Sequence, residues 1–242
     1  MNESYLAPQS DLVEKSSSSG GTLEDGLSGN YTINISNVIS EAWGKTKGVK
    51  RYILGATVLM YVGIFIAVML LALLGTEGAE PGLGFILIQI VTQLLMMTIS
   101  VPFFAGMMLL AMKKVQGQPF DFGDILSGFR KIAPLVIAGA LINVFIIVGF
   151  VFFIIPGLYL SFAYMLTLPL IIDRDMGVWE AMETSRKAIT KHWFSFFGFW
   201  LVMMLIFLVA MIPFGLGLIW IAPMFILAYV IVYREVFGIE SV

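Results

Sequence analysis

Two long stretches of the chain, residues 132–172 and 193–233, carry no charged residue, and each is 41 residues long. Each is interrupted near its middle by a proline with a glycine close by, at Pro156-Gly157 and at Pro213-Phe214-Gly215. The hydrocarbon core of a bilayer takes about 20 helical residues to cross. A run of 41 residues is too long for one crossing and suits two. Each stretch therefore predicts a pair of membrane helices joined by a tight turn.

The same hydropathy pattern extends over most of the chain and predicts an all-α, polytopic membrane protein with six transmembrane helices in three hairpins. The predicted spans cover about 52–75, 84–112, 133–155, 157–173, 193–212 and 214–234. Residues 1–35 are polar and rich in serine and glycine, so we expect a disordered cytoplasmic segment there. The membrane domain then occupies residues 36–242.

Composition supports a membrane protein and narrows the chemistry. Of the 242 residues, 59 % are hydrophobic and only 12 % are charged, whereas soluble domains carry about 25 % charged residues. The absence of cysteine excludes disulfides and thiolate sites, and His192 is the only histidine. We therefore expect no cofactor and no bound metal.

Basic residues lie on one side of the predicted spans. They precede the first, third and fifth spans and follow the second, fourth and sixth, while the opposite loops contain only Glu77 and Glu80 as charged residues. Because basic loops stay in the cytoplasm, both termini are predicted to be cytoplasmic.

The segments before the odd-numbered spans resemble one another and predict an internal repeat with units at about 36–112, 119–173 and 176–236. Each unit has a short cytoplasmic amphipathic helix, a span, an outer turn and a returning span with a proline. In each amphipathic helix a base follows an acid by six positions, at Glu41 and Lys47, Asp124 and Arg130, and Glu180 and Arg186. The prolines of the returning spans, predicted to kink them, are Pro102, Pro169 and Pro223.

Apart from Asp173 and Arg234 at the last positions of the fourth and sixth predicted spans, no aspartate, glutamate, lysine, arginine or histidine lies inside a predicted span. This argues against proton-driven pumping and acid–base catalysis within the bilayer. Among the polar residues that do lie there, Gln89, Gln93 and Ser100 share one face of the second span, and Asn143 is the strongly polar residue of the third. They form either a polar membrane stripe that lines a solute path or a set of interhelical hydrogen bonds. Both interpretations stay open at the level of sequence.

Basic residues at the cytoplasmic edge are candidates for contacts to anionic lipid headgroups. They are Lys113, Lys114, Arg130, Lys131, Arg186, Lys187 and Lys191. The one tight acidic cluster is Asp173-Arg174-Asp175, in which the central arginine favours local pairing over a cation site.

Residues 155–160, 168–173 and 179–186, which include Pro156-Gly157 and Pro169, resemble a broad group of bacterial six-span inner-membrane proteins. That group is similar to the membrane domain of glycerophosphoryl diester phosphodiesterases and to related families of unknown function. The resemblance implies the fold and a place in the bacterial inner membrane. It implies no catalysis, because the chain has no room for the phosphodiesterase barrel.

We therefore expect an integral inner-membrane protein without catalysis of its own, in a lipid-interacting or accessory role. Its expected partners are membrane lipids and other membrane proteins, and not nucleic acid. One alternative is a transporter or channel for a small or apolar solute. A second alternative is a membrane-embedded enzyme that acts on lipid.

Overall fold

The computed structural model describes residues 20–73 and 82–240, and every regular element within them is helical. The elements are α1 (Leu23–Ser28), α2 (Ile35–Lys45), α3 (Lys50–Leu73), α4 (Leu83–Gln116), α5 (Phe122–Ser127), the 3₁₀ turn η1 (Gly128–Lys131), α6 (Ile132–Phe152), α7 (Ile154–Ala163), α8 (Thr167–Arg174), α9 (Val178–Lys191), α10 (Trp193–Met211) and α11 (Leu218–Phe237). Six helical segments are long and apolar enough to cross a membrane. The predicted all-α polytopic fold is confirmed.

The fourth span is not continuous. Helix α7 ends at Ala163, and α8 begins at Thr167. Pro169 is the third residue of α8, directly after this break, whereas Pro102 and Pro223 lie inside α4 and α11. A proline in the first turn of a helix removes an N–H that has no partner within the helix, so Pro169 fits the restart of the helix.

The turn between α6 and α7 lies at Phe153, three residues before the predicted proline. The two helices approach closely at Gly149 and Gly157, since a Cβ on Gly149 would lie 2.9 Å from the Gly157 Cα. Pro156 is again the third residue of its helix. The proline therefore lies in the first turn of the returning helix and not in the connection between the two helices.

The returning spans form the interior of the protein. In the windows from Leu83–Gln116, Ile154–Arg174 and Leu218–Phe237, 44–56 % of the residues are buried, against 6–22 % in the outgoing spans. The three prolines Pro102, Pro169 and Pro223 are all buried. The outgoing spans α3, α6 and α10 consequently present most of their apolar surface to the surroundings.

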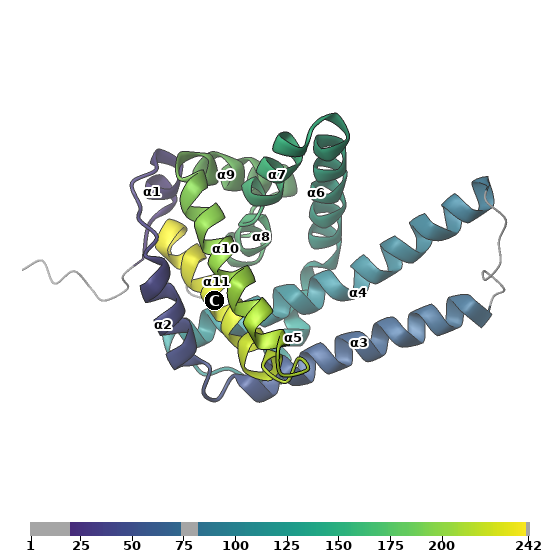
Figure 1. The fold of residues 1–242 in the computed structure, drawn as a ribbon, viewed down its shortest axis with the longest axis horizontal. Helices are drawn as coiled ribbons and strands as arrows, with labels where there is room; N and C mark the ends of the chain where they lie inside the picture. Colours follow the sequence, from purple (N-terminus) through teal and green to yellow (C-terminus); the bar gives the residue numbers. More distant parts are fainter. Residues whose placement is uncertain (1–19, 74–81, 241–242) are drawn as a thin grey trace, which may run out of the picture.

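Each short helix before an outgoing span packs on a returning span. Helix α5 contacts α4, α9 contacts α8, and α2 contacts α11, so the last contact joins the two ends of the chain (Figure 1). This order of elements matches the predicted unit three times. That sequence duplication produced it stays a prediction.

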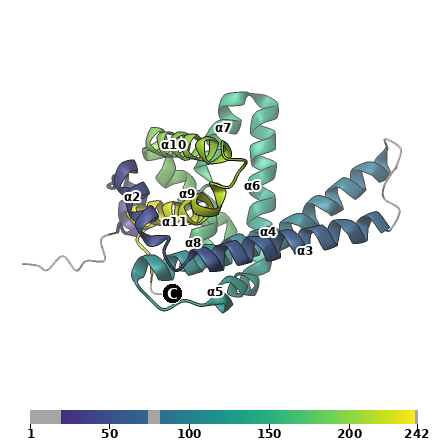
Figure 2. The same ribbon diagram turned by 60° about the horizontal axis from the view of Figure 1, so that its bottom comes forward.

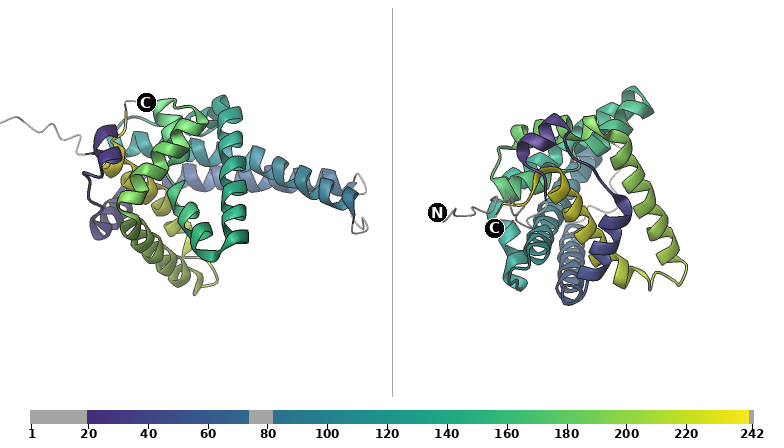
Figure 3. Two further views of the ribbon diagram at one scale, coloured as in Figure 1. Left: turned by 90° about the horizontal axis from the view of Figure 1, so that it is seen from above. Right: turned by 90° about the vertical axis from the view of Figure 1, so that its left-hand side faces the viewer.

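Helices α3 and α4 form a two-helix arm that projects from the other helices, as Figure 2 and the left view of Figure 3 show. Gly63 of α3 lies opposite Ile99 of α4, and the Thr57 hydroxyl lies 3.9 Å from the Met107 sulfur. The inner part of α4, from Ala105 to Met108, is buried in the body. Among the described residues, the hairpin packs against the other helices at its inner end.

The predicted disorder of residues 1–35 is wrong for residues 20–35, and residues 1–19 lie outside the described part. Helix α1 begins with a capping box formed by Thr22 and Asp25. Gly21 lies against the end of α11, where a Cβ would come within 2.4 Å of the Val236 carbonyl oxygen. Tyr31 is only 6 % exposed. The glycines and the threonine of this segment thus serve close packing and helix capping.

Candidate functional site

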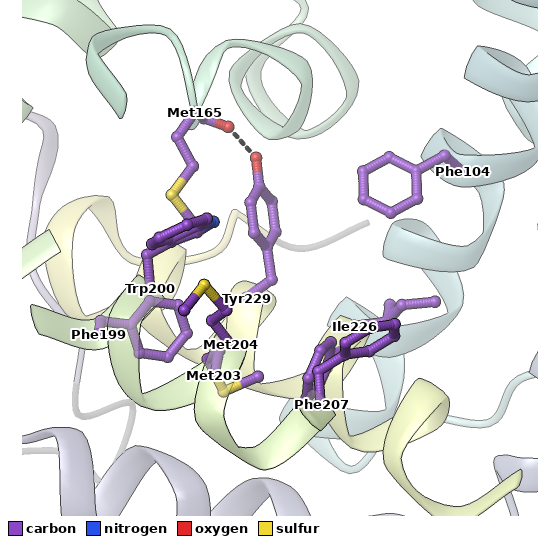
Figure 4. Close-up of a pocket in the computed structure, with 10 residues that line it drawn as sticks. Phe104, Met165, Phe199, Trp200, Met203, Met204, Phe207, Ile226 and Tyr229 are labelled. Atoms are coloured by element: carbon purple, nitrogen blue, oxygen red, sulfur yellow. Dashed lines mark hydrogen bonds between the residues drawn. The ribbon is translucent and has the colours of Figure 1, made fainter. Parts of the chain in front are cut away.

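An apolar pocket of about 370 Å³ lies between α10 and α11 (Figure 4). Helix α4 and the connection between α7 and α8 complete its wall. The lining residues are Phe104, Met165, Phe199, Trp200, Met203, Met204, Phe207, Phe225, Ile226 and Tyr229. The lining consists of aromatic, methionine and isoleucine side chains and contains no charged group.

The break in the fourth span supplies one wall of this pocket. The Tyr229 hydroxyl donates a hydrogen bond to the Met165 carbonyl oxygen, as drawn in Figure 4. The Ser185 hydroxyl, on α9, donates to the Ala163 carbonyl oxygen at 2.8 Å and accepts from the Leu166 N–H at 3.0 Å. Non-helical backbone at membrane depth needs such partners. Because they satisfy these backbone groups, the pocket beside them stays apolar.

The pocket reaches the outer surface of α10. Trp200 is 43 % exposed and Phe207 is 39 % exposed, although both line the cavity. Both residues belong to a candidate membrane span, so the opening faces the apolar part of a bilayer. Methionine side chains adapt to irregular partners. The arrangement can hold a flexible hydrocarbon chain.

The four predicted stripe residues do not line this pocket. Gln89 and Gln93 are exposed on the outer part of α4, and Ser100 is partly buried. Asn143 is exposed on α6 and donates to the Gly139 carbonyl oxygen of its own helix at 2.9 Å. None of the four has a hydrogen bond to another helix among the described residues. Sequence reasoning could not show which way the stripe faces.

The residues of the pocket were missed because each is an ordinary apolar residue within a span. They come from α4, the α7–α8 connection, α10 and α11. The only signal in the sequence is the density of methionine and aromatic residues in 199–207. That density is equally typical of lipid-facing surface.

The predicted headgroup bases form two groups, and two further bases belong to neither. Lys113 pairs with Asp124 at 2.5 Å, and Lys131 pairs with Asp175 at 2.8 Å. Lys131 also donates to the Ile171 carbonyl oxygen. These bases hold the interfacial segments together. Two further bases lie apart, since Lys114 is 5.6 Å from the Phe120 ring centre and Arg130 is exposed.

The other group surrounds a surface hollow of about 520 Å³. Arg186, Lys187 and Lys191 line it together with Thr190 and Leu27. The first four belong to the end of α9, and Leu27 belongs to α1. The structure therefore brings three of the seven predicted bases to one place.

The local pairing predicted for Asp173-Arg174-Asp175 is wrong. Asp173 accepts from the Tyr233 hydroxyl at 2.6 Å, and Arg174 donates to Glu240 at 2.5 Å and to the Phe237 carbonyl oxygen at 2.6 Å. The hydrogen bond from Lys131 lowers the pKa of the exposed Asp175. Helix geometry points consecutive side chains in different directions, so their partners are distant in sequence.

No protein-family model, curated protein or solved structure matches the chain. The resemblance to the membrane domain of glycerophosphoryl diester phosphodiesterases therefore stays a prediction.

Proposed function

We propose that this integral membrane protein binds a lipid by one of its hydrocarbon chains and has no catalytic activity of its own. The observation that carries the proposal is the apolar pocket between α10 and α11, which opens on the membrane-facing surface of α10. We place the protein in a bacterial inner membrane with both termini in the cytoplasm. Its role is accessory, because it acts by binding a lipid and not by catalysing a reaction.

The size and lining of the pocket support a hydrocarbon ligand. A volume of about 370 Å³ falls within the range of small-molecule sites. Its lining has no charged group that would orient a polar solute. A solute path, in contrast, requires polar groups along its length.

The energetics of such binding differ from those in water. A lipid chain that enters the pocket leaves other hydrocarbon, so no hydrophobic driving force favours entry. The gain comes from dispersion contacts with fixed aromatic rings and with adaptable methionines. Selectivity between lipids must then come largely from contacts outside the pocket.

Native mass spectrometry of the protein, purified gently from a bacterial membrane, tests the proposal. We expect retained lipid on the wild-type chain and a loss of most of it in Met204→Trp, which fills the pocket. The matched control is Leu208→Trp, since Leu208 lies on the same helix, is exposed and does not line the pocket. Equal retention in both variants, or no lipid on the wild type, contradicts the proposal.

A further inference from the structure

The hollow at the end of α9 has a fixed wall formed by the segment that follows α1. The Tyr31 hydroxyl donates to the Ala188 carbonyl oxygen at 2.8 Å, and Nε2 of His192 lies 2.8 Å from the Gly29 carbonyl oxygen. The rings of Tyr31 and His192 meet edge to face with their centres 4.8 Å apart. These contacts hold Leu27 and α1 beside the basic residues of α9.

Gly29 allows this close packing. Its φ of 84° lies in the left-handed region, and a Cβ there would come within 3.0 Å of the Lys191 side chain. Glycine adopts this conformation without steric cost. The aliphatic part of Lys191 is therefore held against the backbone at one edge of the hollow.

The hollow carries an excess of positive charge. Glu183 accepts two hydrogen bonds from Arg186, at 2.7 and 2.8 Å, and lies 3.5 Å from the Lys187 ammonium. Lys191 has no acidic partner among the described residues. Three bases and one acid leave two positive charges uncompensated, and both Lys187 and Lys191 are exposed.

The hollow also lies next to the start of a candidate membrane span. Lys191 ends α9, and Trp193 begins the fifth span. The Trp193 ring stacks on Phe197 with 5.4 Å between centres, and Phe194 is 81 % exposed. Aromatic residues gather at the headgroup level of membranes. The position of Lys187 and Lys191 just before this span favours the headgroup level for their charges.

We propose that this hollow binds the phosphate of an anionic phospholipid. Lysine and arginine bind phosphate by charge-assisted hydrogen bonds, and the exposed Leu27 offers an apolar contact to the adjoining glycerol region. The inference deepens the proposed function by naming the headgroup class, and it rests on that function only in taking membrane lipid as the ligand. Soluble phosphate would bind by the same chemistry, and the experiment below distinguishes it from a lipid phosphate.

The test uses the full chain in nanodiscs with equal amounts of zwitterionic and anionic phospholipid, with retained lipids counted by native mass spectrometry. We expect the wild type to enrich anionic lipid and Lys187→Gln with Lys191→Gln to lower that enrichment on the order of tenfold. The matched control is Lys47→Gln with Arg51→Gln, which removes the same charge from two exposed positions elsewhere. Lys187→Arg with Lys191→Arg should retain the enrichment.

Three outcomes overturn the assignment. The first is an equal loss in the control, which would indicate unspecific attraction to basic surface. The second is binding of inorganic phosphate to the wild type in lipid-free detergent, abolished in the double glutamine variant, which would assign the hollow to soluble phosphate. The third is absence of enrichment in the wild type. Met204→Trp lowers the total retained lipid and not its anionic fraction, so failure of the pocket and failure of the hollow are distinguishable.

Discussion

Arg234 donates two hydrogen bonds to Glu41, at 2.7 and 2.9 Å, across 193 positions of the sequence. Arg234 lies near the end of α11, and Glu41 lies in α2. The pair therefore fixes the first interfacial helix to the last span. Helices α5 and α9 pack on spans that directly precede them in the chain, whereas α2 packs on the last span.

Glu41→Gln should lower the free energy of unfolding at neutral pH by about 1–3 kcal/mol, because it removes a charge-assisted pair. The hydrogen bonds from Arg234 hold the pKa of Glu41 below its ordinary value. The stabilisation is thus present above the pKa of the unfolded chain, about 4.3, and is lost as pH falls through the lower folded value. Denaturant unfolding in detergent should show the gap between wild type and variant closing in acid.

The control for this experiment is Glu180→Gln, since Glu180 occupies the corresponding place in the third predicted unit but is exposed. It should leave stability nearly unchanged. A gap for Glu41→Gln that persists undiminished well below the folded pKa would mean that the Glu41 charge contributes nothing.

Ser185→Ala should destabilise the protein by about 1–3 kcal/mol. The Ser185 hydroxyl satisfies a carbonyl and an N–H on either side of the break in the fourth span, and the residue is fully buried. Without it both backbone groups lose their partner. Ser161→Ala is the control, because Ser161 bonds only to the Gly157 carbonyl oxygen of its own helix. Thermal unfolding that ranks the two variants equally would contradict this role.

Gly106→Ala should destabilise the protein by at least about 2 kcal/mol. A Cβ at Gly106 would lie 1.8 Å from the Ile125 carbonyl oxygen, so α5 would have to move away from α4. Overpacking of this kind costs about 1–3 kcal/mol, and sometimes more. Gly44→Ala is the control, since a Cβ there meets nothing within 4 Å. Yield and melting temperature of the purified variants measure the difference.

Gln89→Leu combined with Gln93→Leu should change stability by less than about 0.5 kcal/mol. Both amides are exposed and have no hydrogen bond to another described residue. Lipid retention should also match the wild type. A loss of lipid, or of a solute flux in proteoliposomes, would show that the stripe has a role and would favour the transporter alternative.

The predicted orientation can be tested with single cysteines, because the chain has none of its own. Leu216→Cys lies in the turn between α10 and α11, and Glu180→Cys lies in α9; both positions are exposed. In right-side-out vesicles, a maleimide that does not cross membranes should label Leu216→Cys at once and Glu180→Cys only after the membrane is opened. The reverse pattern would place the termini outside.

The sequence predicts the number and approximate limits of the spans because membrane thickness sets the length of an apolar run. The prediction fails where the same composition is compatible with both disorder and close packing. Gly21 belongs to a segment whose composition is typical of disorder, yet it allows contact with the end of α11. Leu27 lies in the same segment. The sequence therefore predicts the bases that line the hollow but not the α1 wall opposite them. The pocket is formed by four segments that meet only in the folded protein. The spacing of apolar residues along the chain does not predict how these segments are placed relative to one another.

The pairing of α2 with α11 also has a consequence for the order of events during synthesis. Glu41 leaves the ribosome 193 residues before Arg234, its partner. Until α11 has been inserted, α2 lacks the span on which it packs, and the α1 segment lacks its contact to the end of α11. A nascent chain that stalls before the last span therefore exposes an undocked N-terminal segment. Proteases can cleave such an exposed segment, and incomplete chains are then degraded.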